Sequence, residues 1–174
     1  MISSVVSIQV SVSAIEAFFH VVPIDLTSIF KGYGLLPAVI RTEAQTGNWD
    51  AIGQTRIVHL SDGSYAQERL TQYHQPCYFA YVVSDFSGAL GFLVASATGE
   101  WWFDCDAAAD RTLIRWKYTF MPRFWFAVPL LWIVNKFLWA GYMRSIVSNV
   151  EIQLDARSIT SGRLRQRLNF GRSM

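Results

Sequence analysis

The chain has few charged residues and almost no cysteine. Asp, Glu, Lys and Arg make up 16% of its 174 residues, against ~25% in a typical soluble domain. Its two cysteines, Cys77 and Cys105, lie in separate apolar segments whose spacing suggests neither a disulfide framework nor a metal site, so we interpret both as small buried residues. The N-terminus, MISSVVSIQV, has no basic stretch before a continuous apolar run and is not typical of a signal peptide. We therefore expect a cytoplasmic protein.

Recognisable catalytic and cofactor motifs are also missing. There is no GxSxG, no P-loop and no GxGxxG before a helix, and GYGLLP (32–37) has no preceding strand that would make it a phosphate loop. His20, His59 and His74 are scattered, and none is a convincing metal ligand or base. We therefore expect neither a metal nor a cofactor.

Charge is spread unevenly along the chain. All 13 acidic residues lie at or before Asp155, whereas five of the 15 basic residues follow it. Ten basic against thirteen acidic residues leave the body at −3, which does not predict a nucleic-acid-binding surface. We expect residues 156–174 to be a basic, disordered tail, with contact to an anionic surface as the alternative.

Most of the chain alternates apolar and polar residues with the period of a β-strand. The opening strand, in which Val6 to Val12 alternate with polar residues, is followed by two short helices, AIEAFFHVV and a segment starting at Pro23. Helical spacing returns only at the C-terminus, from Pro122 to about Asp155. These patterns predict an α+β fold over residues 1–155, in which a curved antiparallel sheet of about seven strands packs on one long helix. The six further strands are expected at 37–45, 53–60, 64–73, 77–86, 93–105 and 111–120.

The long helix contains a segment of the length that crosses a bilayer, residues 124–143. Pro129, Asn135 and Lys136 interrupt it, so peripheral membrane contact is the better membrane alternative. Extending the apolar face of Met143 and Val150 backwards places Trp132, Lys136 and Trp139 toward the sheet. This row predicts either core packing or the wall of a cavity.

The hairpin around Ser61-Asp62-Gly63 fixes the register of two charged residues. A three-residue loop pairs Arg56 with Glu68, whereas a two-residue turn would oppose Arg56 to Arg69. The pair is either structural or a polar anchor for a ligand, with Glu68, Arg56 and Tyr81 as candidate catalytic groups. The same side of the sheet is expected to supply a ligand cavity of roughly 300–1,000 Å³. Its predicted ligand-binding residues are Leu70, Phe79, Tyr81, Trp116, Tyr118, Trp132, Lys136 and Trp139.

The segments GQTRIVHLSDGSYAQERL, QPCYFAYVVSDF and GEWWFDCDAAADRTLIRWKYTF, with the closing helix, carry a family resemblance. Over residues 4–154 the chain resembles the polyketide cyclase/dehydrase branch of the START and Bet v 1-like (SRPBCC) superfamily. The resemblance implies a helix-grip fold with an internal cavity for a small hydrophobic molecule, such as a lipid, polyketide or isoprenoid. A cyclase- or dehydratase-type enzyme and a membrane-peripheral lipid-binding protein are the alternatives. No catalytic residue is carried over with certainty, and the oligomeric state stays open.

Overall fold

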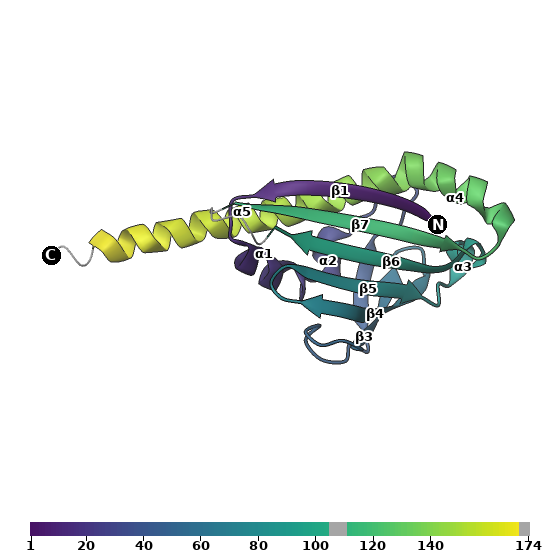
Figure 1. Cartoon of the computed structure of the whole chain (residues 1–174), viewed down its shortest axis with the longest axis horizontal. Coiled ribbons are helices and arrows are strands. Elements are labelled where there is room, and N and C mark those ends of the chain that lie inside the picture. The colour runs from purple at the N-terminus through teal and green to yellow at the C-terminus, as the bar shows by residue number, and fades with distance from the viewer. Residues whose placement is uncertain (105–110, 171–174) are drawn as a thin grey trace.

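A computed structural model of the chain describes the backbone of residues 1–104 and 111–170, with side chains as far as residue 159. Its centre is one curved seven-stranded sheet (Figure 1). The strand order is β1-β7-β6-β5-β4-β3-β2, and every neighbouring pair is antiparallel. The predicted α+β architecture is therefore confirmed. The strands are β1 (Ile2–Val10), β2 (Val39–Glu43), β3 (Thr55–Leu60), β4 (Tyr65–His74), β5 (Tyr78–Ser84), β6 (Val94–Phe103) and β7 (Thr112–Pro122).

Three short helices interrupt the strands. Between β1 and β2 lie the two expected ones, α1 (Ala14–Val21) and α2 (Leu26–Ile29). Each starts at a side-chain cap: the Ser13 hydroxyl accepts a hydrogen bond from the Glu16 amide, and the Asp25 carboxylate accepts one from the Thr27 amide. The third helix, α3 (Gly88–Leu93), was not predicted and lies at the opposite end of the sheet from α1 (Figure 1).

The C-terminal helical segment is not one regular helix. It begins as the 3₁₀ turn η1 (Trp125–Ala127), continues as α4 (Val128–Val134), passes through the π-helical turn η2 (Asn135–Trp139) and ends as α5 (Ala140–Phe170). Its inward side buries a row of apolar side chains against the concave face of the sheet, and these are Met143, Ile146, Val150 and Leu154. The predicted end near Asp155 is wrong, because α5 continues to Phe170 and projects beyond the sheet (Figure 1).

The π-helical turn changes which residues face the sheet. Such a turn holds one more residue than an α-helical turn, so the faces before and after it are offset by one position. Leu131 and Asn135 are therefore buried on the α4 side, and Asn135 is hydrogen-bonded to Ser4 (3.1 Å) and to the Ser3 carbonyl (3.4 Å) of β1. The predicted inward row was wrong for its first members. Trp132 is 51% exposed, and Lys136 is also exposed.

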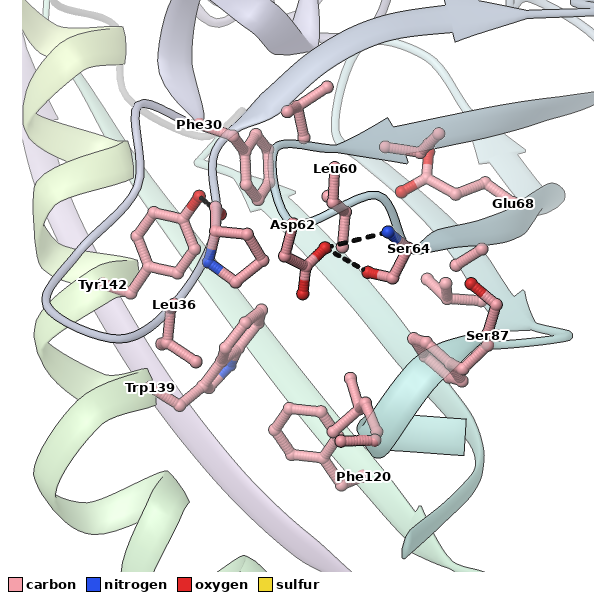
Figure 2. Close-up of a pocket in the computed structure, with 18 of the residues that line it drawn as sticks. Phe30, Leu36, Leu60, Asp62, Ser64, Glu68, Ser87, Phe120, Trp139 and Tyr142 are labelled. Carbon is pink, nitrogen blue, oxygen red and sulfur yellow. Dashed lines mark hydrogen bonds between the residues drawn. The ribbon is translucent and has the colours of Figure 1, made fainter. Parts of the chain in front are cut away.

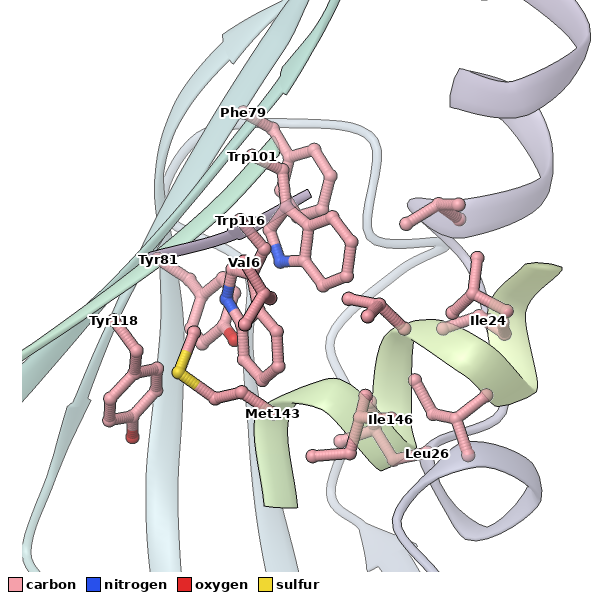
Figure 3. Packing of buried hydrophobic residues seen from close by; sticks show 14 of the residues in the cluster. Val6, Ile24, Leu26, Phe79, Tyr81, Trp101, Trp116, Tyr118, Met143 and Ile146 are labelled. Atoms are coloured by element: carbon pink, nitrogen blue, oxygen red, sulfur yellow. The ribbon is translucent and has the colours of Figure 1, made fainter. Parts of the chain in front are cut away.

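Large aromatic side chains fill the α1 end of the concave face. Phe79 stacks on Trp101 with ring centroids 6.0 Å apart, and Trp101 stacks on Trp116 at 4.9 Å (Figure 3). Phe18 of α1 meets Phe79 edge-on at 6.1 Å. This aromatic stack, together with the fully buried Leu70, leaves no room for a ligand at that end.

The interpretation of Cys77 as an unpaired buried residue was wrong. Cys77 is disulfide-bonded, and Cys105 lies outside the described residues. Disulfides are typical of oxidising compartments, so the cysteines no longer support the predicted cytoplasmic location.

Candidate functional site: a cavity at the α3 end of the sheet

A cavity of about 290 Å³ lies at the end of the concave face that the aromatic stack does not fill (Figure 2). Strands β2 to β5 and β7 form one side of it, and α3, the segment around Leu36 and the helical residues Trp139 and Tyr142 form the other. Most of its wall is apolar, with side chains such as Phe30 and Phe120. The polar residues on the wall are Asp62, Ser64, Glu68, Ser87, Tyr118 and Tyr142.

Two polar turns hold the rim of the cavity in place. In the β3–β4 turn, the Asp62 carboxylate accepts hydrogen bonds from the amide (3.0 Å) and the hydroxyl (2.6 Å) of Ser64 (Figure 2). These bonds lower the pKa of Asp62. Ser87, just before α3, accepts a hydrogen bond from the Tyr65 amide at 2.7 Å and thereby ties α3 to β4. The polar groups at the rim therefore satisfy one another.

Glu68 is the charged residue on the inner wall. As the hairpin register predicted, Arg56 lies opposite Glu68, and Arg56 Nε donates to Glu68 Oε2 at 2.7 Å. Their side chains are only 6% and 9% exposed. The guanidinium of Arg56 also lies 4.0 Å from the ring centroid of Trp49, a cation–π contact that helps to hold it. The ion pair is thus buried, not open to solvent at the sheet end.

The two members of the ion pair face different spaces. Glu68 borders the cavity, whereas Arg56 borders a separate void of about 20 Å³ between the aromatic stack and Trp49. Only Glu68 Oε2 is bonded to Arg56; Oε1 has no hydrogen-bond partner among residues 1–104 and 111–159. Glu68 therefore lines the cavity, and Arg56 does not.

The charge of Glu68 affects the pKa values of two buried tyrosines. Tyr118 lines the cavity, and burial, with added effects of Tyr81 and Glu68, raises its pKa well above the usual range. Burial and the charge of Glu68 also raise the pKa of Tyr81, which borders the small void and not the cavity. Both phenols stay protonated at physiological pH, so Tyr118 can donate a hydrogen bond into the cavity but cannot serve as a base there.

The predicted site residues fall into three groups. Glu68, Tyr118 and Trp139 line the cavity. Trp132 and Lys136 lie on the outer surface of the helical segment, where the ammonium of Lys136 is 4.7 Å from the Trp132 ring. The remaining residues belong to the packed end of the sheet or to the small void, and these are Arg56, Leu70, Phe79, Tyr81 and Trp116.

Sequence reasoning missed the residues that close the cavity. Leu36 lies in a segment predicted to be a loop, and no element is predicted for residues 87–92, although a serine before the apolar run GALGFL is typical of a helix start. Phe30 lies at the end of the second predicted helix, and nothing in the sequence assigned it to a cavity. Trp49 was missed as well, because it lies in a loop with φ of 61°, a conformation that sequence periodicity does not indicate. Among the residues that the structure describes, no cluster of three or more His, Cys, Asp or Glu side chains is arranged to hold a metal ion.

Solved structures share this fold at low sequence identity. A point mutant of norcoclaurine synthase from Thalictrum flavum, in complex with a transition-state analogue, matches with a TM-score of 0.65 and 12% identity over 90% of this chain and 97% of its own. Ara h 8.0201 matches with a TM-score of 0.57 and 19% identity over 86% and 97% of the two chains. Major latex-like protein 151 from Panax ginseng matches with a TM-score of 0.59 and 11% identity over 87% and 96%.

These matches establish the fold class. The chain has the Bet v 1-like helix-grip fold, as the sequence resemblance predicted. No family model matches the sequence, and no curated protein matches it either. At such low identities the likeness extends to the fold alone, so the function is argued from the cavity.

Proposed function

We propose that the protein binds a small, mainly apolar molecule that carries a hydroxyl group, and that short isoprenoid-like alcohols are the ligand class. The observation that carries this proposal is a mainly apolar cavity lined by both Glu68, whose Oε1 is not bonded to Arg56, and the protonated Tyr118. An apolar pocket with a few convergent polar groups is the usual form of a small-molecule site.

The size of the cavity supports occupancy by an apolar ligand. The cavity wall is mainly apolar, so a ligand that fills it is favoured by about 25 cal/mol for each Å² of apolar surface that it removes from water. At about 30 Å³ per water-sized group, the cavity holds on the order of ten non-hydrogen atoms. This suits a short isoprenoid or a single ring better than a polyketide chain or a full-length lipid.

The polar groups on the wall favour an alcohol over a carboxylic acid. A ligand hydroxyl can donate to Glu68 Oε1 and accept from the Tyr118 phenol. A ligand carboxylate would instead place a second negative charge next to Glu68 in poorly solvated surroundings, which is unfavourable. Arg56, the cation that would offset this repulsion, lies behind the wall.

Binding is favoured over catalysis because the candidate catalytic groups do not converge on the cavity. Glu68 lines it, whereas Arg56 and Tyr81 border the small void. A cyclase- or dehydratase-type reaction by this trio would need all three at the substrate. The norcoclaurine synthase structure, with its bound transition-state analogue, supports only that a protein of this fold can bind a small molecule.

The proposal is tested by titrating the protein calorimetrically with geraniol, geranic acid and the hydrocarbon myrcene at pH 7. We expect geraniol to bind at least tenfold more tightly than geranic acid, a difference of about 1.4 kcal/mol. Glu68→Gln should narrow this difference, whereas Glu43→Gln, at an exposed carboxylate on β2, should leave it unchanged. Equal affinity for the alcohol and the acid would refute the assigned head group, and absence of saturable binding by all three would refute the ligand class.

A further inference from the structure

The outer side of η1, α4 and η2 exposes an unusual number of large apolar side chains. We call this surface the aromatic patch and define it by Phe124, Trp125, Phe126, Trp132, Ile133 and Phe137. Phe124 and Phe126 stack with their centroids 5.1 Å apart, and Trp125 meets Phe126 at 6.0 Å. Trp125 and Phe137, at 86% and 65% exposed, project from the surface. Contiguous exposed apolar groups of this kind indicate an interaction surface.

The aromatic patch lies next to the rim of the cavity. Arg123, just before η1, donates from its backbone amide to the Leu93 carbonyl (2.8 Å) and from its side chain to the Gly91 carbonyl (2.9 Å). These bonds join the patch to α3, which forms part of the cavity wall and carries the exposed Phe92. At the other end, η2 contains Trp139, which lines the cavity itself. A partner bound to the patch would therefore lie next to the cavity wall.

The charge around the patch identifies the chemistry of that partner. Two basic residues lie at the patch, Arg123 just before η1 and Lys136 within η2, and the sequence from Arg111 to Val150 contains no acidic residue. The ammonium of Lys136 lies over the rings of Trp132 (4.7 Å) and Phe137 (5.5 Å), within the patch. Aromatic side chains that project beside basic groups suit the interface of a bilayer with anionic head groups. A second copy of this chain fits less well, because a two-fold contact through the patch would place two copies each of Lys136 and Arg123 in one interface, with no acidic residue from 111–150 to offset them.

The segment is arranged to lie on a bilayer and not to cross it. Residues 125–159 form one helical stretch long and apolar enough to span a membrane by length and composition. Its inner side is nevertheless packed against the sheet, because Leu131 and Met143 are buried and Asn135 is hydrogen-bonded to β1. Crossing would require the helix to leave the sheet and open the core. We propose that the aromatic patch docks the protein on the surface of an anionic bilayer, with the cavity rim beside the membrane.

The test is co-sedimentation of the full chain, without added ligand, with vesicles of phosphatidylcholine alone or mixed three to one with phosphatidylglycerol. We expect the wild type to bind the anionic vesicles, and the double variant Trp125→Ala/Phe137→Ala to bind them at least tenfold more weakly. The control is Phe19→Ala/Ile52→Ala, which removes two side chains outside the patch that are 55% and 64% exposed and should bind like the wild type. Lys136→Glu should weaken binding to the anionic vesicles, because it reverses the charge within the patch.

Several outcomes would overturn the docking surface. One is a wild type that binds neither kind of vesicle; another is equal loss of binding in the patch and control variants. Sedimentation equilibrium distinguishes the competing occupant: a wild-type dimer that becomes a monomer in Trp125→Ala/Phe137→Ala, without vesicle binding, would make the patch a contact between copies. Unchanged melting temperatures establish that the variants are folded. The assay uses no ligand, so its result is independent of the proposed ligand class.

Discussion

Enlarging the side chain of Ala66 should stabilise the ligand-free protein. Ala66 lies on β4 between Ser64 and Glu68, and its side chain faces the cavity. Leu in its place adds three carbon atoms, worth about 2.4 kcal/mol at ~0.8 kcal/mol for each buried CH₂. Ordering the Leu side chain costs ~0.5–1 kcal/mol, which leaves a net gain of about 1.5–2 kcal/mol.

The same change at Ala17 should have the opposite effect. Ala17 on α1 is completely buried among core side chains and does not border the cavity. Overpacking at such a position costs ~1–3 kcal/mol. Comparing Ala66→Leu with Ala17→Leu therefore separates a true cavity from space that only looks empty.

Thermal unfolding of protein stripped of co-purified apolar molecules is the assay. For a chain of this size each kcal/mol shifts the melting temperature by ~2–4 °C. We therefore expect a rise of about 3–8 °C for Ala66→Leu and a fall for Ala17→Leu. Ala66→Leu should also weaken geraniol binding, because it occupies the ligand's space. The reasoning is refuted if both variants lower the melting temperature by similar amounts.

Three further predictions concern buried polar groups. Arg56→Met should destabilise the protein by ~3–5 kcal/mol in urea unfolding, because it leaves the buried Glu68 carboxylate without its partner. Arg56→Met/Glu68→Leu should recover most of that loss, and a loss below ~1 kcal/mol in the single variant would contradict the prediction. The raised pKa of Tyr118 implies stability that is complete below the unfolded value of 10.0 and falls as the pH rises above it. Tyr118→Phe should make that decline shallower in urea unfolding between pH 8 and 11, and an unchanged slope would count against it. Asn135→Leu should lower the free energy of unfolding by ~1–3 kcal/mol, because it removes the hydrogen bonds to β1, whereas Lys136→Leu should change it by no more than ~0.5 kcal/mol. A larger loss for Lys136→Leu than for Asn135→Leu would contradict the placement of Asn135, and not Lys136, on the inner side of the π-helical turn.

The sheet could be predicted because its signals are local. Strand residues alternate with period two, and Ser61-Asp62-Gly63 has the composition of a three-residue turn with glycine at positive φ; Gly63 has φ of 83°. Once this turn is placed, the pairing of Arg56 with Glu68 follows, since a shift of one residue would turn the apolar face outward. The register of β3 and β4 could therefore be predicted from a single sequence.

The position of the cavity could not be predicted from the sequence in the same way. Inward-facing residues at both ends of the sheet are large and apolar, so periodicity places Trp116 and Tyr118 on one face without distinguishing their roles. In the structure Trp116 is part of the aromatic stack, and Tyr118 lines the cavity. The difference arises from α1, which brings Phe18 onto one end, and from α3, which closes the other end without filling it. Such packing depends on contacts between distant segments.

The π-helical turn explains both why Trp132 and Lys136 do not face the sheet as predicted and why the aromatic patch is exposed. In a regular helix, the face defined by Met143 and Val150 would continue through Lys136 and Trp132 toward the sheet. The additional residue in η2 places Asn135 there instead, where its amide satisfies Ser4 and the Ser3 carbonyl of the edge strand β1. Lys136 and Trp132 consequently move to the outer side, next to Phe137. The additional residue in η2 thus keeps the unpaired ammonium of Lys136 out of the core, and it places the aromatic and basic side chains on the surface beside the cavity.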